Sequence, residues 1–276
     1  MSITGLCAAI SCPKEEDMQT DKVCDFIVQW LIDYARKAGM QGFVVGISGG
    51  IDSAVTSTLC AKTGLDVQVL NMPIYQAPNQ EQLAGRHISW LQEHFARVQG
   101  VHVDLTSPFQ ALEKTFPGSI QDGLTMANTR ARLRMLTLYA FASHNHMLVA
   151  GTGNKVEDFG VGFYTKYGDG GVDIAPIADL MKSEVYALGQ HLGILEDIIQ
   201  TVPTDGLWAD NRSDEDQLGA SYAELEKIML FLEQGGNKSN LSPRDKEVLE
   251  IYRRLRARNQ HKMEPIPVAV IPDHLR

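Results

Sequence analysis

Residues 46–53 read Gly-Ile-Ser-Gly-Gly-Ile-Asp-Ser, a short stretch that combines small, hydroxyl-bearing and acidic side chains. It follows the apolar run 43–45 and precedes a helix predicted over 54–63, so we expect a loop between a buried strand and a helix. The glycines let backbone N–H groups approach an anion, the serines add hydroxyl donors, and the helix directs its positive end towards the same loop. Asp52 adds a carboxylate, a ligand that Mg²⁺ favours. This chemistry predicts a site for phosphate groups and a metal ion.

Two common nucleotide motifs do not account for this loop. It lacks the Gly-Lys-Ser/Thr ending of a P-loop, and no Gly-x-Gly-x-x-Gly fingerprint follows a predicted strand. The string Ser-Gly-Gly-Ile-Asp-Ser at 48–53 resembles the pyrophosphate loop of the ATP pyrophosphatases. That resemblance implies cleavage of ATP between its α and β phosphates to adenylate a carboxylate, an amide or a tRNA base. The alternative interpretation is a glycine-rich turn needed only for tight packing.

The composition predicts a soluble chain with a substantial core. The chain has 276 residues, of which 44% are hydrophobic, without the long apolar run of a membrane-spanning helix. Its formal net charge of −9 argues against non-specific nucleic-acid binding, so an anionic substrate needs a local basic pocket. Four cysteines without a C-x-x-C pair argue against a disulfide framework and a zinc site, and the N-terminus lacks the pattern of a secretory signal. We therefore expect a cytoplasmic protein that binds neither nucleic acid nor membranes.

Apolar runs and helical periodicity alternate along the first part of the chain. An amphipathic helix is predicted after a Thr20-Asp21 cap and ends near Gly39. Strands are predicted at 42–47, 67–72, 101–105 and 147–151, with helical stretches between them. This order predicts an α/β fold, a doubly wound, mainly parallel five-stranded sheet with helices on both faces, Rossmann-like in type. Such sheets bind ligands beyond the carboxyl ends of their strands, where the loop 46–53 would lie.

Helical spacing dominates the C-terminal third. Helices are predicted over 182–192, over 222–232 and after Ser242-Pro243, a favourable helix start. Residues 203–217, rich in Asp, Asn and Gly, are predicted to form a surface loop and a mobile lid. Because no linker composition marks a boundary, 1–276 is predicted to be a single domain with an irregular N-terminal arm at 1–18.

A second motif narrows the resemblance. Residues 151–158 read Gly-Thr-Gly-Asn-Lys-Val-Glu-Asp, and 165–171 read Thr-Lys-Tyr-Gly-Asp-Gly-Gly. The second string resembles NAD synthetase, the family that amidates deamido-NAD with ATP and a nitrogen donor, and the resemblance extends from the loop 46–53 to His261-Lys262. It implies an adenylated nicotinate carboxylate and release of AMP and pyrophosphate. The chemistry is consistent, because a carboxylate is a poor acyl donor and transfer of AMP from ATP supplies the leaving group.

The resemblance assigns site residues position by position. Asp52 and Glu157 would hold Mg²⁺, while Asp52, Lys182 and Asp173 would be catalytic. ATP would bind at Gly46, Ile47, Ser48, Gly49, Gly50, Ile51, Asp52, Ser53, Thr152, Lys182 and Thr204. Deamido-NAD would bind at Arg132, Lys166, Asp173, His261 and Lys262. The second set is weighted towards cations, as a dinucleotide with a pyrophosphate and a carboxylate requires.

The chain departs from the family pattern at three places. One extra residue precedes Gly162, so either Glu157 or Asp158 would hold the metal, and the register with the preceding threonine favours Glu157. Met263 stands where an arginine is expected, which removes one cation near the substrate. Residues 205–207 read Asp-Gly-Leu where the family pattern has alanine and then an acidic residue.

Other residues carry alternatives of their own. Arg130 and Arg134 share one helix face and Arg132 lies opposite, so the three cannot share a role; the alternative for Arg130 and Arg134 is solvent-facing charge. The glycines of 166–171 suit a flexible loop that closes over the adenylate and excludes water, and a simple surface turn is the alternative. Ser48 is interpreted as a phosphate donor rather than a nucleophile, because no His-Asp arrangement is specified around it.

The sequence also leads to expectations about the nitrogen donor and the assembly, and it leaves competing functions open. Glutamine-using relatives carry an amidase domain for which this chain has no room, so free ammonia is the expected donor, with a separate glutaminase as the alternative. The resemblance also implies a homodimer with deamido-NAD at the interface, and the helix faces around Trp30 and 133–141 are candidate contacts. The competing functions are another ATP pyrophosphatase, such as a GMP-synthetase-like subunit or a tRNA-modifying adenylase, and an ATP sensor without catalysis.

Overall fold

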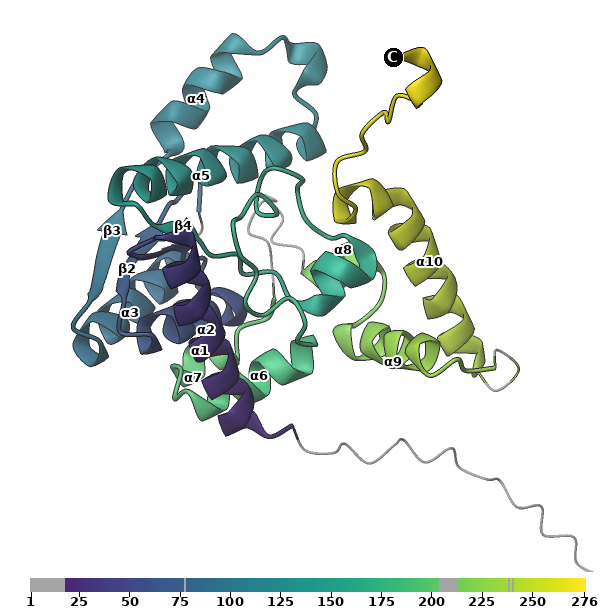
Figure 1. Cartoon of the computed structure of the whole chain (residues 1–276), viewed down its shortest axis with the longest axis horizontal. Coiled ribbons are helices and arrows are strands. Elements are labelled where there is room, and N and C mark those ends of the chain that lie inside the picture. Colours follow the sequence, from purple (N-terminus) through teal and green to yellow (C-terminus); the bar gives the residue numbers. More distant parts are fainter. Residues whose placement is uncertain (1–17, 77, 204–212, 238, 240) are drawn as a thin grey trace, which may run out of the picture.

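The computed structural model describes residues 18–76, 78–203, 213–237, 239 and 241–276. Within these residues a single parallel sheet has the order β3-β2-β1-β4. Its strands are β1 (Gly42–Gly46), β2 (Asp66–Asn71), β3 (Val98–His102) and β4 (Leu148–Val149). Strand β1 pairs with both β2 and β4, so the loop after β1 leaves the interior of the sheet rather than its edge (Figure 1).

Helices connect the strands and pack against them. In chain order they are α1 (Thr20–Ala38), α2 (Ile51–Lys62), α3 (Pro78–His94), α4 (Thr106–Thr115), η1 (Gly118–Ile120), α5 (Gly123–Asn145), α6 (Lys182–His191) and α7 (Glu196–Ile199). Neighbouring strand residues face opposite sides, since side chains alternate along a strand. Phe43 and Val45 therefore join one core cluster, while Val44 joins another.

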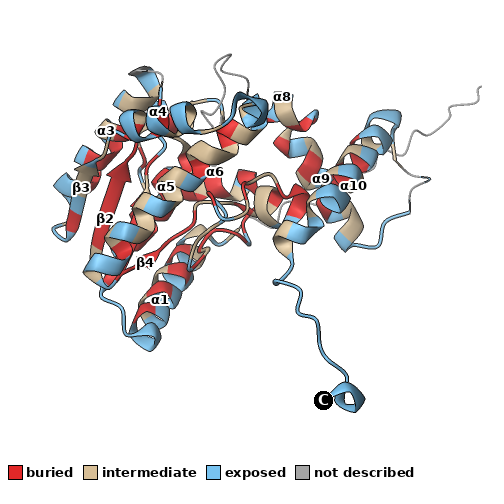
Figure 2. Cartoon of the chain, turned by 90° about the horizontal axis from the view of Figure 1, so that it is seen from above, coloured by how far each residue is buried: buried red, intermediate tan, exposed pale blue. Residues whose placement is uncertain are grey.

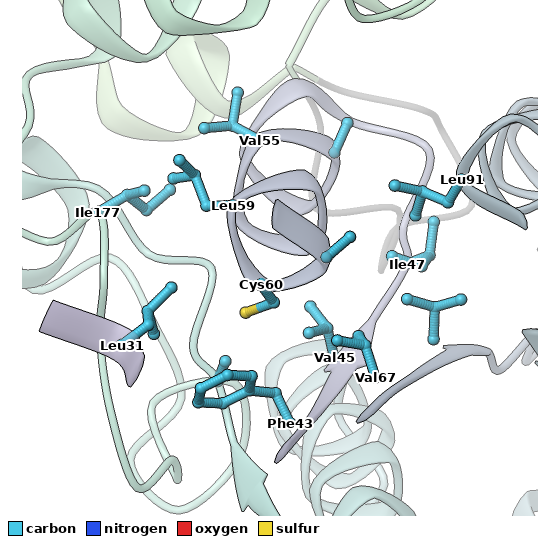
Figure 3. Close-up of a cluster of buried hydrophobic side chains, with 14 of the residues drawn as sticks. Leu31, Phe43, Val45, Ile47, Val55, Leu59, Cys60, Val67, Leu91 and Ile177 are labelled. Atoms are coloured by element: carbon cyan, nitrogen blue, oxygen red, sulfur yellow. The ribbon is translucent and has the colours of Figure 1, made fainter. Parts of the chain in front are cut away.

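The two clusters explain which helices cover which face. Figure 3 shows the first cluster, in which α2 covers Phe43, Val45 and Val67 of the sheet. Leu31 of α1 and Leu91 of α3 belong to the same cluster. In the second cluster, Val44, Leu70 and Val149 pack against α4 and α5 through Phe109 and Met126. Because both faces of the sheet are buried, its strands carry apolar side chains at successive positions, which is why they appear as apolar runs in the sequence.

A third cluster forms the helical part of the chain. It joins η2, a turn of π-helix (Val156–Val161), to α8 (Asp214–Leu218), α9 (Tyr222–Glu233) and α10 (Pro243–Met263). Ser213, Ser221 and Ser242 begin the three α-helices as reciprocal capping boxes, which confirms the helix start predicted at Ser242-Pro243. Helices α9 and α10 lie beside the sheet, and the segment after α10 extends away from the body to η4 (Asp273–Leu275) (Figures 1 and 2).

The structure corrects several predicted boundaries. The third strand is Val98–His102 rather than 101–105, because the pairing with β2 begins at Val67↔Val98. The helix after the loop begins at Ile51 rather than 54. Thr20 is not a cap; it is the first residue of α1, and its Oγ1 donates to the Met18 carbonyl.

The predicted count of five strands is also not reached among the described residues. In place of a fifth strand, a single parallel bridge joins Ala150 to Ile174, and the N–H groups of Asp173 and Ile174 both donate to the Val149 carbonyl. Residues 1–17 of the predicted N-terminal arm and 204–212 of the predicted lid lie outside the described residues. Residues 214–217 of that lid belong to α8. No helix within the described ranges combines the length and the apolar character needed to cross a membrane.

Candidate active site

The loop between β1 and α2 is held in shape by its own serines. The Ser48 N–H donates to Ser53 Oγ at 3.2 Å, Ser53 Oγ donates to the Gly50 carbonyl at 2.9 Å, and the Gly50 N–H donates to Ser48 Oγ at 3.2 Å. Gly49 has a φ of +88°, and a β-carbon there would lie 2.8 Å from the Gln80 carbonyl oxygen. Only glycine fits at this position, whereas Gly50 has an ordinary φ of −93°. The loop thus ends directly at the N-terminus of α2, where an anion is favoured.

Lys182 joins the two carboxylates predicted to hold a metal. Its Nζ lies 2.6 Å from Asp52 Oδ2 and 3.3 Å from Glu157 Oε1. The three side chains come from the first turns of α6, α2 and η2, so three separate elements meet here. The Lys182 side chain is 3% exposed, and those of Asp52 and Glu157 are 18% and 16% exposed. One buried cationic atom therefore bridges both carboxylates.

The protonation of this group follows from its contacts. Burial works against the charge on Lys182, but Asp52 and Glu157 raise the pKa of its ammonium above the ordinary value, so it stays charged. Burial raises the pKa of Glu157, and Lys182 opposes that effect. Burial and the charge of Glu157 raise the pKa of the neighbouring Asp158 to about 8. Since Glu157 is the residue that shares a cation with Asp52, the geometry favours Glu157 over Asp158 as the metal ligand.

Two side chains that sequence reasoning missed orient these carboxylates. Asn154, fully buried, donates from Nδ2 to Asp52 Oδ1 at 3.1 Å, and its Oδ1 accepts the N–H groups of Val156 and Glu157. Tyr222, the first residue of α9, donates its hydroxyl to Glu157 Oε1 at 2.6 Å. Asn154 lies inside the motif 151–158, where its position was a usable signal. Nothing local to Tyr222 indicates a partner 65 positions away.

A cavity of about 250 Å³ lies at the carboxyl ends of β1, β2 and β4. The predicted ATP residues Gly46, Ile47, Ser48, Asp52, Ser53 and Thr152 line it together with Glu157. Apolar side chains, including Met72, Met135, Leu138 and Val172, form another part of its wall. A smaller cavity of about 60 Å³ contains Gly49, Gly50, Ile51 and Lys182 and shares Ser48 and Asp52 with the first. The loop therefore lies where a polar and an apolar region of one site meet, as a nucleotide requires.

Arg134 belongs to this cavity, which corrects the alternative of solvent-facing charge. Its Nε donates to the Met72 carbonyl at 3.0 Å, and its guanidinium also donates to Gln76 Oε1 at 3.0 Å. Arg130 is half-buried, and its guanidinium lies 5.1 Å from the centre of the Phe109 ring. The predicted separation of Arg132 from these two is confirmed, since Arg132 is exposed and donates to the Lys166 carbonyl at 3.3 Å.

Four of the five residues predicted to bind deamido-NAD lie near one another. Besides its contact with Arg132, Lys166 donates from Nζ to the His261 carbonyl at 2.5 Å. Lys262 donates from Nζ to the carbonyls of Gly162 and Tyr164 at 2.9 and 2.7 Å, and burial lowers the pKa of this ammonium. These residues gather several cationic side chains in one region, which is the kind of local basic pocket that an anionic substrate would need. The Lys262 ammonium, however, donates its hydrogen bonds to backbone carbonyls.

Asp173 and the predicted flexible loop take a different form. Asp173 accepts the Tyr139 hydroxyl at 3.0 Å and the Val149 N–H at 2.8 Å, so its carboxylate fixes the end of β4. The loop 166–171 is a series of turns around Thr165, whose carbonyl accepts the N–H groups of Gly168 and Gly170. Asp169 closes the loop by accepting the Thr165 N–H at 3.0 Å. Thr204 lies outside the described residues.

The chemistry of the acidic pair fits Mg²⁺. Asp52 and Glu157 offer hard oxygen atoms that already face one cationic atom from two sides. Within the described ranges, no group of three or more His, Cys, Asp or Glu side chains is arranged to bind a metal by itself. A divalent ion held by this pair would thus complete its coordination with phosphate oxygens or water.

Comparisons with known proteins match nearly the whole chain. A family model described as NAD synthase matches residues 23–266. The NH(3)-dependent NAD(+) synthetase of Carboxydothermus hydrogenoformans is 35% identical over 240 residues, which cover 86% of this chain and 92% of that protein. Among solved structures, NMN synthetase from Francisella tularensis is 32% identical with a TM-score of 0.80, covering 93% of this chain and all of that one. The NH3-dependent NAD synthetase from Campylobacter jejuni is 26% identical with a TM-score of 0.76, covering 92% and 100% of the two chains. The chain belongs to the NAD synthase family.

Proposed function

We propose that this chain is an ammonia-dependent NAD synthetase that converts deamido-NAD to NAD in NAD biosynthesis, with ATP as co-substrate. One observation carries the assignment of ATP to this site. The loop from Ser48 to Ser53 meets the cluster of Asp52, Lys182 and Glu157 in the wall of two adjoining cavities. Family membership argues against the competing functions, a GMP-synthetase-like subunit, a tRNA-modifying adenylase and an ATP sensor.

The reaction has two steps. The nicotinate carboxylate attacks the α-phosphorus of ATP, the bond to the β-phosphate oxygen breaks, and pyrophosphate leaves. Ammonia then attacks the acyl carbon, AMP leaves with the bonding electron pair, and the nitrogen loses a proton as the amide forms. The loop N–H groups and the Lys182 ammonium stabilise charge on the phosphates in the first step. In this proposal Ser48 acts as a hydroxyl donor, and no side chain forms a covalent intermediate.

We assign the metal to Asp52 and Glu157. When bound, Mg²⁺ would neutralise and orient the phosphates of ATP. Asn154 and Lys182 hold Asp52, while Tyr222 and Lys182 hold Glu157, so both carboxylates are oriented before nucleotide binds. Arg132, Lys166 and His261 are the proposed contacts for the anionic substrate, and Asp173 supports them by holding the end of β4.

The mononucleotide is a second candidate substrate. The solved structure described as NMN synthetase has a higher identity and TM-score to this chain than the Campylobacter NAD synthetase has. Nicotinic acid mononucleotide carries the same reacting carboxylate as deamido-NAD and lacks the adenylate half. Measuring kcat/KM for each substrate decides between them, and we expect the higher kcat/KM for deamido-NAD.

The activity test uses the purified chain with ATP, Mg²⁺, ammonium and deamido-NAD, and follows NAD and AMP in parallel. We expect equal amounts of both products, and a loss of at least about 100-fold in Asp52→Ala because an electrostatic contact to the reacting phosphates is removed. Asp197→Ala, which removes an exposed carboxylate of α7, is the matched control and should keep full activity. AMP without NAD would contradict the assigned substrate or nitrogen donor, and neither product would contradict the function.

The assembly and compartment are further parts of the proposal. We propose a homodimer with the substrate site at its interface, supported by Phe26, Trp30 and Tyr34, which are exposed along one strip of α1. We propose the cytoplasm as the compartment, supported by the free, buried thiols of Cys24 and Cys60. Residues 1–276 are proposed to act as one domain, which is consistent with a family match over 23–266.

A further inference from the structure

The hydroxyl of Tyr222 is a hydrogen-bond donor buried beside the acidic pair. Tyr222 is 5% exposed, its hydroxyl lies 2.6 Å from Glu157 Oε1, and it lies 3.4 Å from Asp214 Oδ2. The face of its ring lies 4.6 Å from Lys182 Nζ, measured to the ring centre. Tyr222 therefore contacts two of the three charged groups that define the candidate metal and phosphate site.

The two oxygens of this contact have fixed roles. An ionised carboxylate can only accept a hydrogen bond, so in this contact the Tyr222 hydroxyl is the donor and Glu157 Oε1 is the acceptor. The same Glu157 Oε1 also accepts from Lys182 Nζ, but at the longer distance of 3.3 Å. The hydroxyl is thus the shorter of the two contacts on this oxygen.

Tyr222 contacts Glu157 from a separate element, the first turn of α9. Its ring packs with Leu225, Ile228 and Tyr252 in the helical cluster, and its own N–H donates to Glu215 Oε1 at 2.9 Å. Glu157 belongs to η2, which follows the end of β4. Because η2 and α9 already pack together in this cluster, the hydroxyl contact adds a hydrogen bond from α9 to the Glu157 carboxylate itself. Asn154 similarly joins the Asp52 carboxylate to the start of η2.

We propose that Tyr222 is a positioning residue whose hydroxyl holds Glu157 in the orientation in which Glu157 and Asp52 share one cation, and that it thereby sets the Mg²⁺ affinity of the nucleotide complex. The inference rests on the proposed function. Groups that hydrogen-bond to metal ligands without touching the metal typically change metal affinity or activity by about 10- to 100-fold when removed. Without the hydroxyl, Glu157 Oε1 loses its shorter contact and keeps the longer one to Lys182, so the carboxylate is held less firmly.

The test is Tyr222→Phe, which keeps the packed ring and removes only the donor. Tyr252→Phe is the matched control, because Tyr252 is another buried tyrosine of the same cluster. Within the described part of the chain its hydroxyl accepts one long contact, from Arg256 at 3.5 Å. Mg²⁺ is titrated in the presence of a non-hydrolysable ATP analogue, with thermal stabilisation as the readout. We expect the half-saturating Mg²⁺ concentration to rise about 10-fold or more in Tyr222→Phe and to stay unchanged in Tyr252→Phe. In steady-state assays kcat should fall while the KM for deamido-NAD stays within about twofold, since Tyr222 contacts Glu157, Asp214 and Lys182, which are not among the proposed deamido-NAD contacts.

A double-mutant cycle tests the inference even if Tyr222→Phe also disturbs the packing of the helical cluster. If Tyr222 acts through Glu157, its effect on Mg²⁺ affinity should disappear in the Glu157→Gln background. An unchanged Mg²⁺ titration in folded Tyr222→Phe, or an effect of equal size in the Glu157→Gln background, overturns the inference. Failure of the proposed function gives a different result, because the wild-type chain itself would then form no NAD from deamido-NAD, ATP and ammonium.

Discussion

At the scale of single residues, Lys182 takes the position that a bridging cation would take. Its ammonium contacts Asp52 and Glu157 together, at 2.6 and 3.3 Å. Two carboxylates so close to each other are stable only while a positive charge lies between them. The chain thus supplies a cation of its own to this pair, and the phosphate groups of ATP would attract the same ammonium.

Lys182→Met should therefore change both stability and metal response. We expect a loss of roughly 3 kcal/mol in the free energy of unfolding, because a buried pair loses one partner, and at least about 100-fold in kcat/KM. We also expect Mg²⁺ alone to stabilise the variant, since the ion can replace the missing charge, whereas it should have little effect on the wild-type chain without nucleotide. Chemical denaturation with and without Mg²⁺ measures both effects.

Lys155→Met is the matched control for this experiment. Lys155 bonds Glu233 at 3.1 Å with a side chain that is 25% exposed, outside the cluster. Its removal should cost about 1 kcal/mol or less and leave the Mg²⁺ response unaltered. A Lys182→Met variant as stable as the wild-type chain, or one indifferent to Mg²⁺, would contradict the role of the ammonium as a substitute cation.

The site was predictable where its residues are local to a motif. Asp52 and Glu157 follow strands within short, specific strings, so their convergence follows from parallel strands ending at one edge. Tyr222 and Arg134 are placed by packing between distant parts of the chain, and no periodicity indicates the atoms they contact. Arg134 looks like surface charge on a helix, and only the neighbouring Met72 carbonyl reveals that it faces the cavity.

At the scale of elements, the packing of α2 against α3 depends on a buried neutral histidine. His87 of α3 is fully buried, its Nε2 lies 3.0 Å from Ser57 Oγ of α2, and its ring stacks on Trp90. Burial lowers the pKa of His87 to about 4. Since α2 begins directly after the loop residues Ser48 to Gly50, this contact between α2 and α3 helps to hold the loop in place.

The buried histidine predicts a loss of stability in acid. In the unfolded chain His87 binds a proton near pH 6.5, but in the folded chain it does so only near pH 4, so the unfolded state gains protons first as the pH falls. The wild-type chain should lose roughly 2 kcal/mol relative to His87→Gln between pH 7 and pH 5. Urea unfolding of both proteins at the two pH values measures the difference, and parallel pH profiles would contradict the prediction.

The order and type of the elements were more predictable than their limits. Four strands and the helices between them follow from apolar runs and helical spacing, and Ser242-Pro243 marks a real helix start. The third strand was placed three residues late, because Val101 to Leu105 is the more apolar stretch while the pairing partner of Val67 is Val98. Among the described residues the fifth strand is reduced to the bridge between Ala150 and Ile174, and next to it the Val149 N–H donates to the Asp173 carboxylate rather than to a backbone carbonyl.

At the scale of the whole molecule, the apolar surface is not evenly spread. Helix α1 buries Cys24, Ile27, Leu31 and Ala35 against the sheet. It leaves Phe26 71%, Trp30 37% and Tyr34 39% exposed along a strip of four-residue steps. Two of these rings, Trp30 and Tyr34, contact each other with centres 5.6 Å apart. Aromatic side chains gathered in this way are the kind that dominate the energy of protein interfaces.

If this strip is the dimer contact, the double variant Phe26→Ser, Tyr34→Ser should weaken association. Two aromatic anchors at about 2 kcal/mol each correspond to an increase in the dimer dissociation constant of roughly 1000-fold. Sedimentation across a concentration series measures this constant. Leu230→Ser, which removes an exposed apolar side chain from α9, is the control and should leave the dimer intact. Because a shared site needs both chains, the KM for deamido-NAD should rise as the double variant dissociates. A wild-type chain that sediments as a monomer while fully active would contradict both the dimer and the shared site.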